Sequence, residues 1–79
     1  MKQSIRNRDE NGNLHGKQIN YHSNGNIRWI WNYHHGKLNG YEAWFRSDNS
    51  IDIKQYWNMN NKIYEEDHRW SNNQIQIKI

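Results

Sequence analysis

The chain has 79 residues, a formal net charge of +3 and only 33% hydrophobic residues. It contains no cysteine, which excludes disulfides and thiolate chemistry, and no apolar run approaches the ~18 residues of a membrane-spanning helix. Five Trp and five Tyr nevertheless favour a folded domain, because disordered chains are poor in aromatic residues. We therefore expect one small domain with no integral membrane segment. The lack of an apolar leader predicts a cytoplasmic location, in a bacterial or an infected host cell.

Alternation of apolar and polar residues predicts strands throughout and no helix. In chain order the strands span residues 3–10, 14–22, 27–35, 38–46, 51–59, 62–70 and 75–79. Turn signals separate them at Asn24-Gly25, Gly36-Lys37, Asp48-Asn49, Asn60-Asn61 and Asn72-Asn73. Because these turns are short, each strand is expected to pair with the next. The predicted fold class is all-β, a single-layer antiparallel β-meander of about seven strands.

The predicted hairpins repeat at an interval of about 24 residues. Leu14 recurs as Leu38, and Gly16 recurs as Gly40. The single domain 1–79 is thereby divided into a partial copy 1–13, copies 14–37 and 38–62, and a partial copy 63–79.

A two-residue loop at Asn60-Asn61 would set the register of the later strands. It places Lys54 opposite Asp67, an opposite-charge pair of the kind that stabilises sheets, and Trp57 beside Tyr64. One face is then expected to carry Ile27, Trp29, Trp31, Tyr33, Trp44, Ile51, Ile53, Trp57, Tyr64, Trp70, Ile75 and Ile77. The opposite face is expected to carry Ile19, Tyr21, Ile30, Tyr41, Ala43, Phe45 and Tyr56.

Two segments carry glycine, aromatic and Asn-Gly residues in a spacing that resembles MORN repeats. They are GKQINYHSNG at 16–25 and GKLNGYEAWF at 36–45. The resemblance extends over most of the chain, and Glu65 departs from it where the two earlier copies have glycine. It implies a twisted single sheet that serves as a binding or dimerisation surface, in scaffolds, membrane-association modules, and immunity or antitoxin components. It implies no catalytic residue.

The histidines raise the question of a metal site. His34 and His35 are neighbours in a predicted strand, so their side chains are expected to point to opposite faces and not to bind one ion together. His15 is expected opposite His34, with Glu10 as the only nearby third ligand. We therefore predict no metal and no cofactor. No nucleophile with a base and no convergent pair of carboxylates is evident, so no catalytic residue is predicted either.

The aromatic face predicts a surface for another protein, because a single sheet leaves apolar area exposed and Trp, Tyr and Arg dominate interface energetics. The expected partner-binding residues are Trp29, Trp31, Tyr33, Trp44, Arg46 and Trp57. The expected edge or dimer contacts are Ile75, Ile77 and Ile79. The predicted function is a non-catalytic module that docks on a partner of unknown identity, as a scaffold, an immunity protein or a phage-type inhibitor of a host enzyme. A homodimer is a further expectation.

Two alternatives stay open. The aromatic face could stack on the bases of a single-stranded nucleic acid, and an affinity that falls steeply with salt would identify that function. The other alternative is association with a membrane surface, which the MORN resemblance implies, although Lys and Arg do not gather along one edge.

Overall fold

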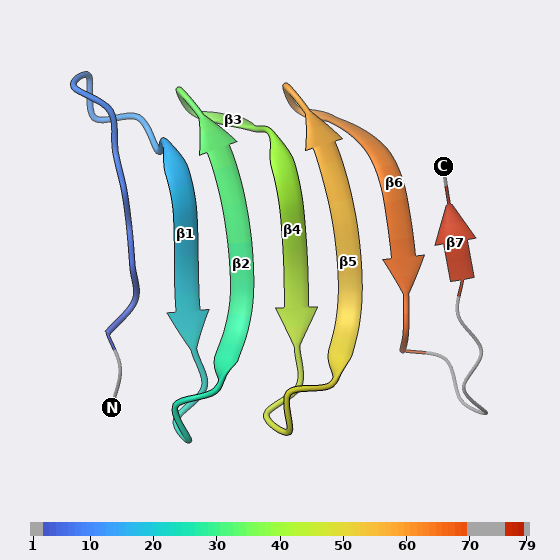
Figure 1. Ribbon diagram of the computed structural model, residues 1–79. Coiled ribbons are helices and arrows are strands. Elements are labelled where there is room, and N and C mark those ends of the chain that lie inside the picture. Colours follow the sequence, from blue (N-terminus) through green and yellow to red (C-terminus); the bar gives the residue numbers. More distant parts are fainter. Residues whose placement is uncertain (1–2, 70–75, 79) are drawn as a thin grey trace.

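A computed structural model describes residues 3–69 and 76–78 and shows one open antiparallel sheet (Figure 1). Its strands are β1 (Gly16–Tyr21), β2 (Ile27–His34), β3 (Lys37–Leu38), β4 (Gly40–Phe45), β5 (Ile51–Asn58), β6 (Asn61–Asp67) and β7 (Gln76–Lys78). The spatial order is β1-β2-β4-β5-β6-β7, and the short β3 pairs with β2. The predicted fold class, an all-β meander in a single layer, is confirmed.

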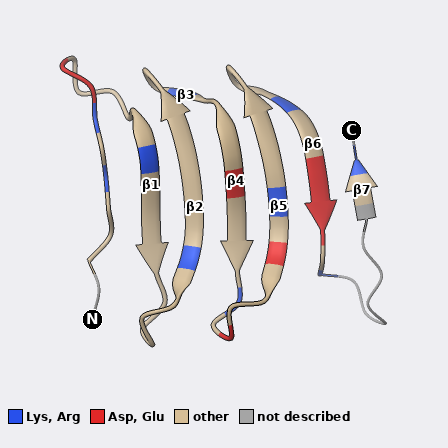
Figure 2. Cartoon of the chain, viewed as in Figure 1, with Lys and Arg blue, Asp and Glu red and all other residues tan. Residues whose placement is uncertain are grey.

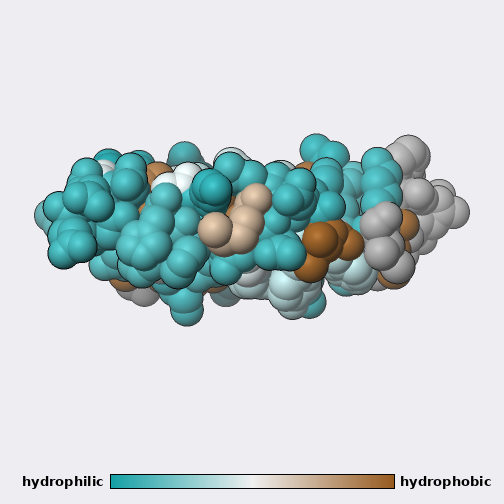
Figure 3. Space-filling model, turned by 90° about the horizontal axis from the view of Figure 1, so that it is seen from above, coloured by the Kyte–Doolittle hydropathy of each residue, from teal (hydrophilic) through white to brown (hydrophobic). Residues whose placement is uncertain are grey.

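The sheet is a single layer. Its Cα atoms extend over 46 × 35 × 9 Å, and the view from above shows a thin slab (Figure 3). Among the residues described, Ala43 is the only apolar residue that is buried, whereas Gln18 and Glu42 are buried polar residues. Most of the apolar area therefore stays on the two faces of the sheet. The described segments include no helix that could cross a membrane.

The backbone conformation repeats every 24 residues. Positive φ angles recur at Gly12, Gly36 and Asn60, at Gly16 and Gly40, at Gly25 and Asn49, and at His35 and Met59. The predicted turns at Asn24-Gly25 and Asp48-Asn49 are present, as loops 22–26 and 46–50. Each loop has a single positive-φ residue, as expected for a type I turn followed by a left-handed residue rather than a type I′ turn. Asn72-Asn73 lies outside the described residues.

The hairpin turns at the other end of the sheet lie one residue earlier than predicted. Instead of Gly36-Lys37 and Asn60-Asn61, the two-residue loops are His35-Gly36 and Met59-Asn60. All four residues in these loops have positive φ, which both central positions of a type I′ turn require. The prediction was wrong because non-glycine residues such as Met seldom adopt this backbone, so the first position of these loops gave no clear signal.

The register of β6 is also shifted from the prediction. Lys54 pairs with Glu66 instead of Asp67, and Tyr64 pairs with Tyr56. The earlier turn and a β-bulge after Tyr56 together cause the shift. A shift of one residue exchanges the two faces of a strand, so Tyr64 lies on the face opposite to the one predicted.

The predicted strand 3–10 is reduced to two isolated β-bridges. The side chain of Gln18, only 1% exposed, accounts for this. Its Oε1 accepts the N–H of Asn7 at 2.9 Å, and its Nε2 donates to the carbonyl of Asn7 at 2.7 Å. A side-chain amide thus takes the place of backbone ladder bonds along this edge.

Met59 offers a test of the observed turn. Its φ of 46° is costly for a side chain with no local hydrogen bond to offer, whereas Asn tolerates this backbone. We expect Met59→Asn to raise the free energy of unfolding by about 1 kcal/mol, measured by urea denaturation. The control, Met59→Ala, keeps the unfavourable backbone and should give no gain. An equal gain for both variants would contradict a left-handed Met59.

Candidate protein-binding surface

One face of the sheet carries a cluster of half-buried rings, which we call the tryptophan face: Trp29, Trp31, Tyr33, Trp44 and Trp57. Trp44 pairs with Trp29 across β2 and β4, and their ring centroids are 6.2 Å apart. The ring of Trp31 packs edge-on against Trp44, with centroids 5.8 Å apart, and stacks on Tyr33, with centroids 6.3 Å apart. These distances are typical of favourable aromatic pairs. Five of the six predicted partner-binding residues are therefore neighbours.

A buried carboxylate orients two of these rings. Trp44 Nε1 donates to one oxygen of Glu42 at 2.6 Å, and Trp57 Nε1 donates to the other at 2.7 Å. Glu42 is 3% exposed. Sequence reasoning missed this role, although a signal existed. Gln18, which is also buried, stands 24 residues earlier at the same place in the repeat.

A small cavity opens between the rings. Its volume is about 270 Å³. It is lined by Arg6, Leu14, Gln18, Trp29, Trp31, Tyr33 and Trp44. Pockets for drug-sized ligands occupy roughly 300–1,000 Å³, so this cavity lies at the lower end of that range and has room for one or two side chains.

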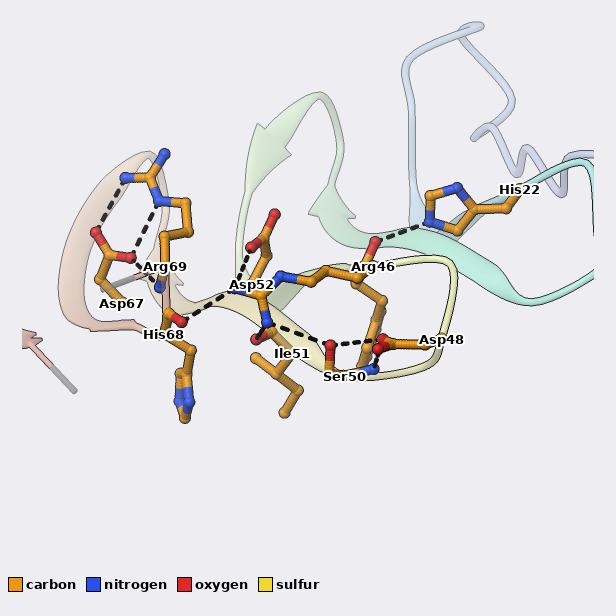
Figure 4. Close-up of polar contacts among 10 residues, drawn as sticks. His22, Arg46, Asp48, Ser50, Ile51, Asp52, Asp67, His68 and Arg69 are labelled. Carbon is orange, nitrogen blue, oxygen red and sulfur yellow. Dashed lines mark hydrogen bonds and ion pairs between the residues drawn. The ribbon is translucent and has the colours of Figure 1, made fainter. Parts of the chain in front are cut away.

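Arg46 contributes to the sheet's own contacts. Its guanidinium forms an ion pair with Asp52 at 3.0 Å and donates to the carbonyl of His68 at 3.1 Å (Figure 4). It also contacts Ser50 within the β4–β5 turn, at 3.2 Å. These contacts connect that turn to the chain leaving β6. The structure therefore gives Arg46 a bracing position at this end of the sheet.

The opposite face carries a second ladder, formed by Tyr41, Tyr56 and Tyr64. The Tyr41 and Tyr56 ring centroids are 5.5 Å apart, and those of Tyr56 and Tyr64 are 5.8 Å apart. The hydroxyl of Tyr64 donates to Glu66 at 2.7 Å. Sequence reasoning missed this ladder because it placed Tyr64 on the other face.

Of the predicted edge contacts, Ile77 is the one that the structure describes. It lies in β7, opposite Glu66, and is 58% exposed. Because β6 is shifted, Ile77 belongs to the tyrosine side of the sheet and not to the predicted tryptophan side. Ile75, Ile79 and Trp70 lie outside the described residues. The predicted dimer contact stays a prediction.

Acidic side chains gather on β6 (Figure 2). Glu65 Oε1 accepts a hydrogen bond from Lys62 Nζ at 2.8 Å, and its Oε2 forms an ion pair with Lys78 Nζ at 3.6 Å. Arg69 donates to both oxygens of Asp67, each at 3.0 Å. These hydrogen bonds lower the pKa of Asp67 from 3.8 to about 2. Both carboxylates are buried, and the cations that pair with them neutralise their charge.

The lowered pKa of Asp67 predicts how the stability depends on pH. A carboxyl whose pKa is lower when folded stabilises the fold above its unfolded value near 3.8. This contribution is lost as the pH falls from about 4 to about 2, because the unfolded chain then binds the proton first. We expect the melting temperature to fall across this window, followed by circular dichroism. Asp67→Asn should flatten that fall, and an unchanged slope would contradict the assignment.

The histidines lie differently from the prediction. His35 occupies the β2–β3 turn, where its φ of 46° breaks the alternation that was expected to separate it from His34. One nitrogen from each of His15, His34 and His35 lies within 4.8 Å of the others. His35 Nδ1 also lies 2.7 Å from Asp9, and this contact lowers the pKa of Asp9 to about 2. The expectation that His34 and His35 cannot converge is therefore wrong.

Comparisons of the chain with protein-family models, with curated proteins and with solved structures found no match.

Proposed function

We propose that the chain is a non-catalytic protein-binding module that docks through its tryptophan face. One observation carries this proposal: among the described residues the only buried apolar one is Ala43, while every ring of the tryptophan face is half-exposed. A contiguous apolar patch of this kind usually marks an interaction site. Tryptophan and tyrosine are also the residues that contribute most to binding energy at protein interfaces.

The charges beside the rings favour a protein over a nucleic acid. Glu42, Glu65 and Asp67 lie on the same side of the sheet as the tryptophans, as their strand pairing requires. Carboxylates there would repel phosphate groups, and the nearby Lys62 and Arg69 already pair with them. Arg6, at the cavity, is well placed to attract a carboxylate of a partner protein.

We further propose that the chain is a degenerate MORN-like repeat protein. The recurrence of positive φ angles at intervals of 24 residues supports this assignment, because the glycines that carry the resemblance occupy those positions. A scaffold, an immunity protein or an inhibitor of an enzyme would each use such a surface. Each of these three functions requires binding to another protein and no catalysis by the chain itself.

The experiment uses charge reversals that leave the rings in place. The partner is first captured from a lysate, identified and purified, and its affinity for the chain is measured at 50 and 500 mM salt. Arg6→Glu, at the cavity, should weaken binding at least tenfold. Lys17→Glu makes the same charge change at an exposed position that faces the other side of the sheet, and should leave the affinity unchanged.

Two outcomes would overturn the proposal. One is equal loss of binding in the Arg6 and Lys17 variants, which would exclude the tryptophan face as the docking site. The other is a nucleic acid as the retained molecule, with an affinity that falls steeply between 50 and 500 mM salt. Light scattering of the chain alone, over ~5–500 μM, establishes beforehand whether a second copy occupies the surface.

A further inference from the structure

Three imidazoles gather at one end of the sheet. His15 immediately precedes β1, His34 ends β2, and His35 begins the turn into β3. Their ring centroids lie between 4.3 and 5.2 Å apart. One nitrogen from each lies within 4.8 Å of the other two. We propose that this cluster binds one divalent transition-metal ion of the class that prefers imidazole, Zn²⁺, Ni²⁺ or Cu²⁺.

The geometry requires only a small adjustment to hold such an ion. Metal–nitrogen bonds of about 2.0–2.1 Å in a tetrahedral site place the ligand nitrogens about 3.4 Å apart. The observed separations therefore have to close by at most about 1.4 Å. His34 is exposed, so rotation of its side chain meets little resistance. Three protein ligands leave a fourth position for water.

A buried carboxylate, that of Asp9, is the hydrogen-bond partner of one of the proposed ligands, His35. Asp9 Oδ2 accepts a hydrogen bond from His35 Nδ1–H at 2.7 Å, which leaves the lone pair of Nε2 for a metal. Metal-binding histidines almost always donate their second nitrogen in this way. The carboxylate of Asp9 is only 5% exposed, and its Oδ1 accepts the N–H groups of Asn11 and Asn13, both at 2.9 Å. Asp9 is thus fixed by its own turn and orients an exposed imidazole.

His15 supplies an independent readout of metal binding. Its Nδ1 accepts the backbone N–H of His35 at 3.0 Å. A neutral imidazole has one nitrogen with a free lone pair, so His15 cannot keep this bond and bind a metal through Nε2. If it binds through Nδ1 instead, the metal displaces the N–H. Either way the N–H of His35 loses its acceptor, and its NMR signal should shift on addition of metal.

The test uses the full 79-residue chain purified without a histidine tag. Calorimetry with Zn²⁺ and with Ni²⁺ should show one ion per chain. Mg²⁺, which prefers oxygen ligands, should show none. His34→Ala should weaken binding at least tenfold, and because His34 is exposed this variant keeps the fold. Asp9→Asn keeps an oxygen that can accept the N–H groups of Asn11 and Asn13 but removes the negative charge that accepts the hydrogen bond of His35. It should weaken Zn²⁺ binding 10–100-fold.

His68→Ala is the matched control, since His68 lies outside the cluster and pairs with Glu66. Its affinity for Zn²⁺ should equal that of the native chain, and Zn²⁺ should raise the melting temperature of both but not that of His34→Ala. Equal binding by the native chain and His34→Ala would overturn the proposal. So would an equal loss in His68→Ala, or a His35 N–H signal that does not respond to saturating Zn²⁺.

Discussion

Replacing Glu42 with alanine is expected to lower the free energy of unfolding by about 3–4 kcal/mol. The carboxylate is 3% exposed and accepts the Nε1–H groups of Trp44 and Trp57 at 2.6 and 2.7 Å. Hydrogen bonds to a charged group contribute about 1.5–3 kcal/mol each, and truncation leaves both donors without an acceptor. A domain of this size has a total stability of only about 4–12 kcal/mol. Urea denaturation followed by tryptophan fluorescence measures the loss.

Two control variants make this test specific. Glu42→Gln keeps the shape of the side chain but can accept from only one indole, so its loss should be intermediate, about 1–2 kcal/mol. Glu10→Ala removes an exposed carboxylate and should change the free energy of unfolding by less than about 0.5 kcal/mol. If Glu42→Ala unfolds at the same urea concentration as Glu10→Ala, the bridge between the two indoles contributes nothing to stability.

The β-meander and the tryptophan face could be predicted because their signals are long and redundant. Trp29, Trp31 and Tyr33 alternate with other residues over a whole strand, so a boundary error of one or two residues leaves them on one face. Short turns between successive alternating segments then allow only antiparallel neighbours. Each element agrees with the others, which is why the fold class is right although several boundaries are not.

The register of β6 could not be predicted in the same way, because it depends on one turn and one β-bulge. A loop at Met59-Asn60 instead of Asn60-Asn61 moves the pairing of β6 by two residues, which alone keeps its faces. The β-bulge after Tyr56 moves the pairing back by one residue, and this exchanges the faces of β6 beyond the bulge. The opposite-charge pair expected between Lys54 and Asp67 favoured the wrong loop. Glu66 supplies a carboxylate opposite Lys54 in the observed register, so the charge pattern fits either register.

The histidine cluster was missed for the same physical reason. Strand periodicity separates His34 from His35 only while the backbone stays extended. The left-handed backbone of His35 ends that periodicity, and residue type alone gave no sign of it. The equivalent Met59 adopts the same backbone in the next hairpin, so this departure from strand periodicity belongs to the 24-residue repeat.

Buried polar side chains replace much of an apolar core in this thin sheet. Gln18, Glu42, Glu65 and Asp67 are all buried. Among the residues described, no buried side-chain nitrogen or oxygen lacks a hydrogen-bond partner. A satisfied polar network costs little and fixes geometry, whereas a half-satisfied one is costly. The rings can therefore remain half-exposed, as the proposed docking requires, while the Nε1–H groups of Trp44 and Trp57 hold two of them in place.

The tryptophan face should accordingly contribute to stability as well as to binding, and Trp44→Ala tests this. The ring centroid of Trp44 lies 6.2 Å from that of Trp29 and 5.8 Å from that of Trp31. Its Nε1–H donates a hydrogen bond to Glu42. Truncating a buried aromatic residue costs about 3–5 kcal/mol, and because Trp44 is half-buried we expect a loss of about 2–4 kcal/mol in the free energy of unfolding. Urea denaturation followed by circular dichroism gives the value.

Trp44→Phe separates the two contributions of this side chain. It keeps an aromatic ring between Trp29 and Trp31 but removes the Nε1–H, so its loss should be about 1.5–2 kcal/mol, the low end of the range for one hydrogen bond to a charged group. If Trp44→Ala were as stable as the native chain, the ring would be a contact residue alone, and any loss of partner binding would measure the interface directly. If both variants lose stability as expected, docking on this face has to be mapped with exposed positions such as Arg6, because truncating a ring there changes the fold and the contact together.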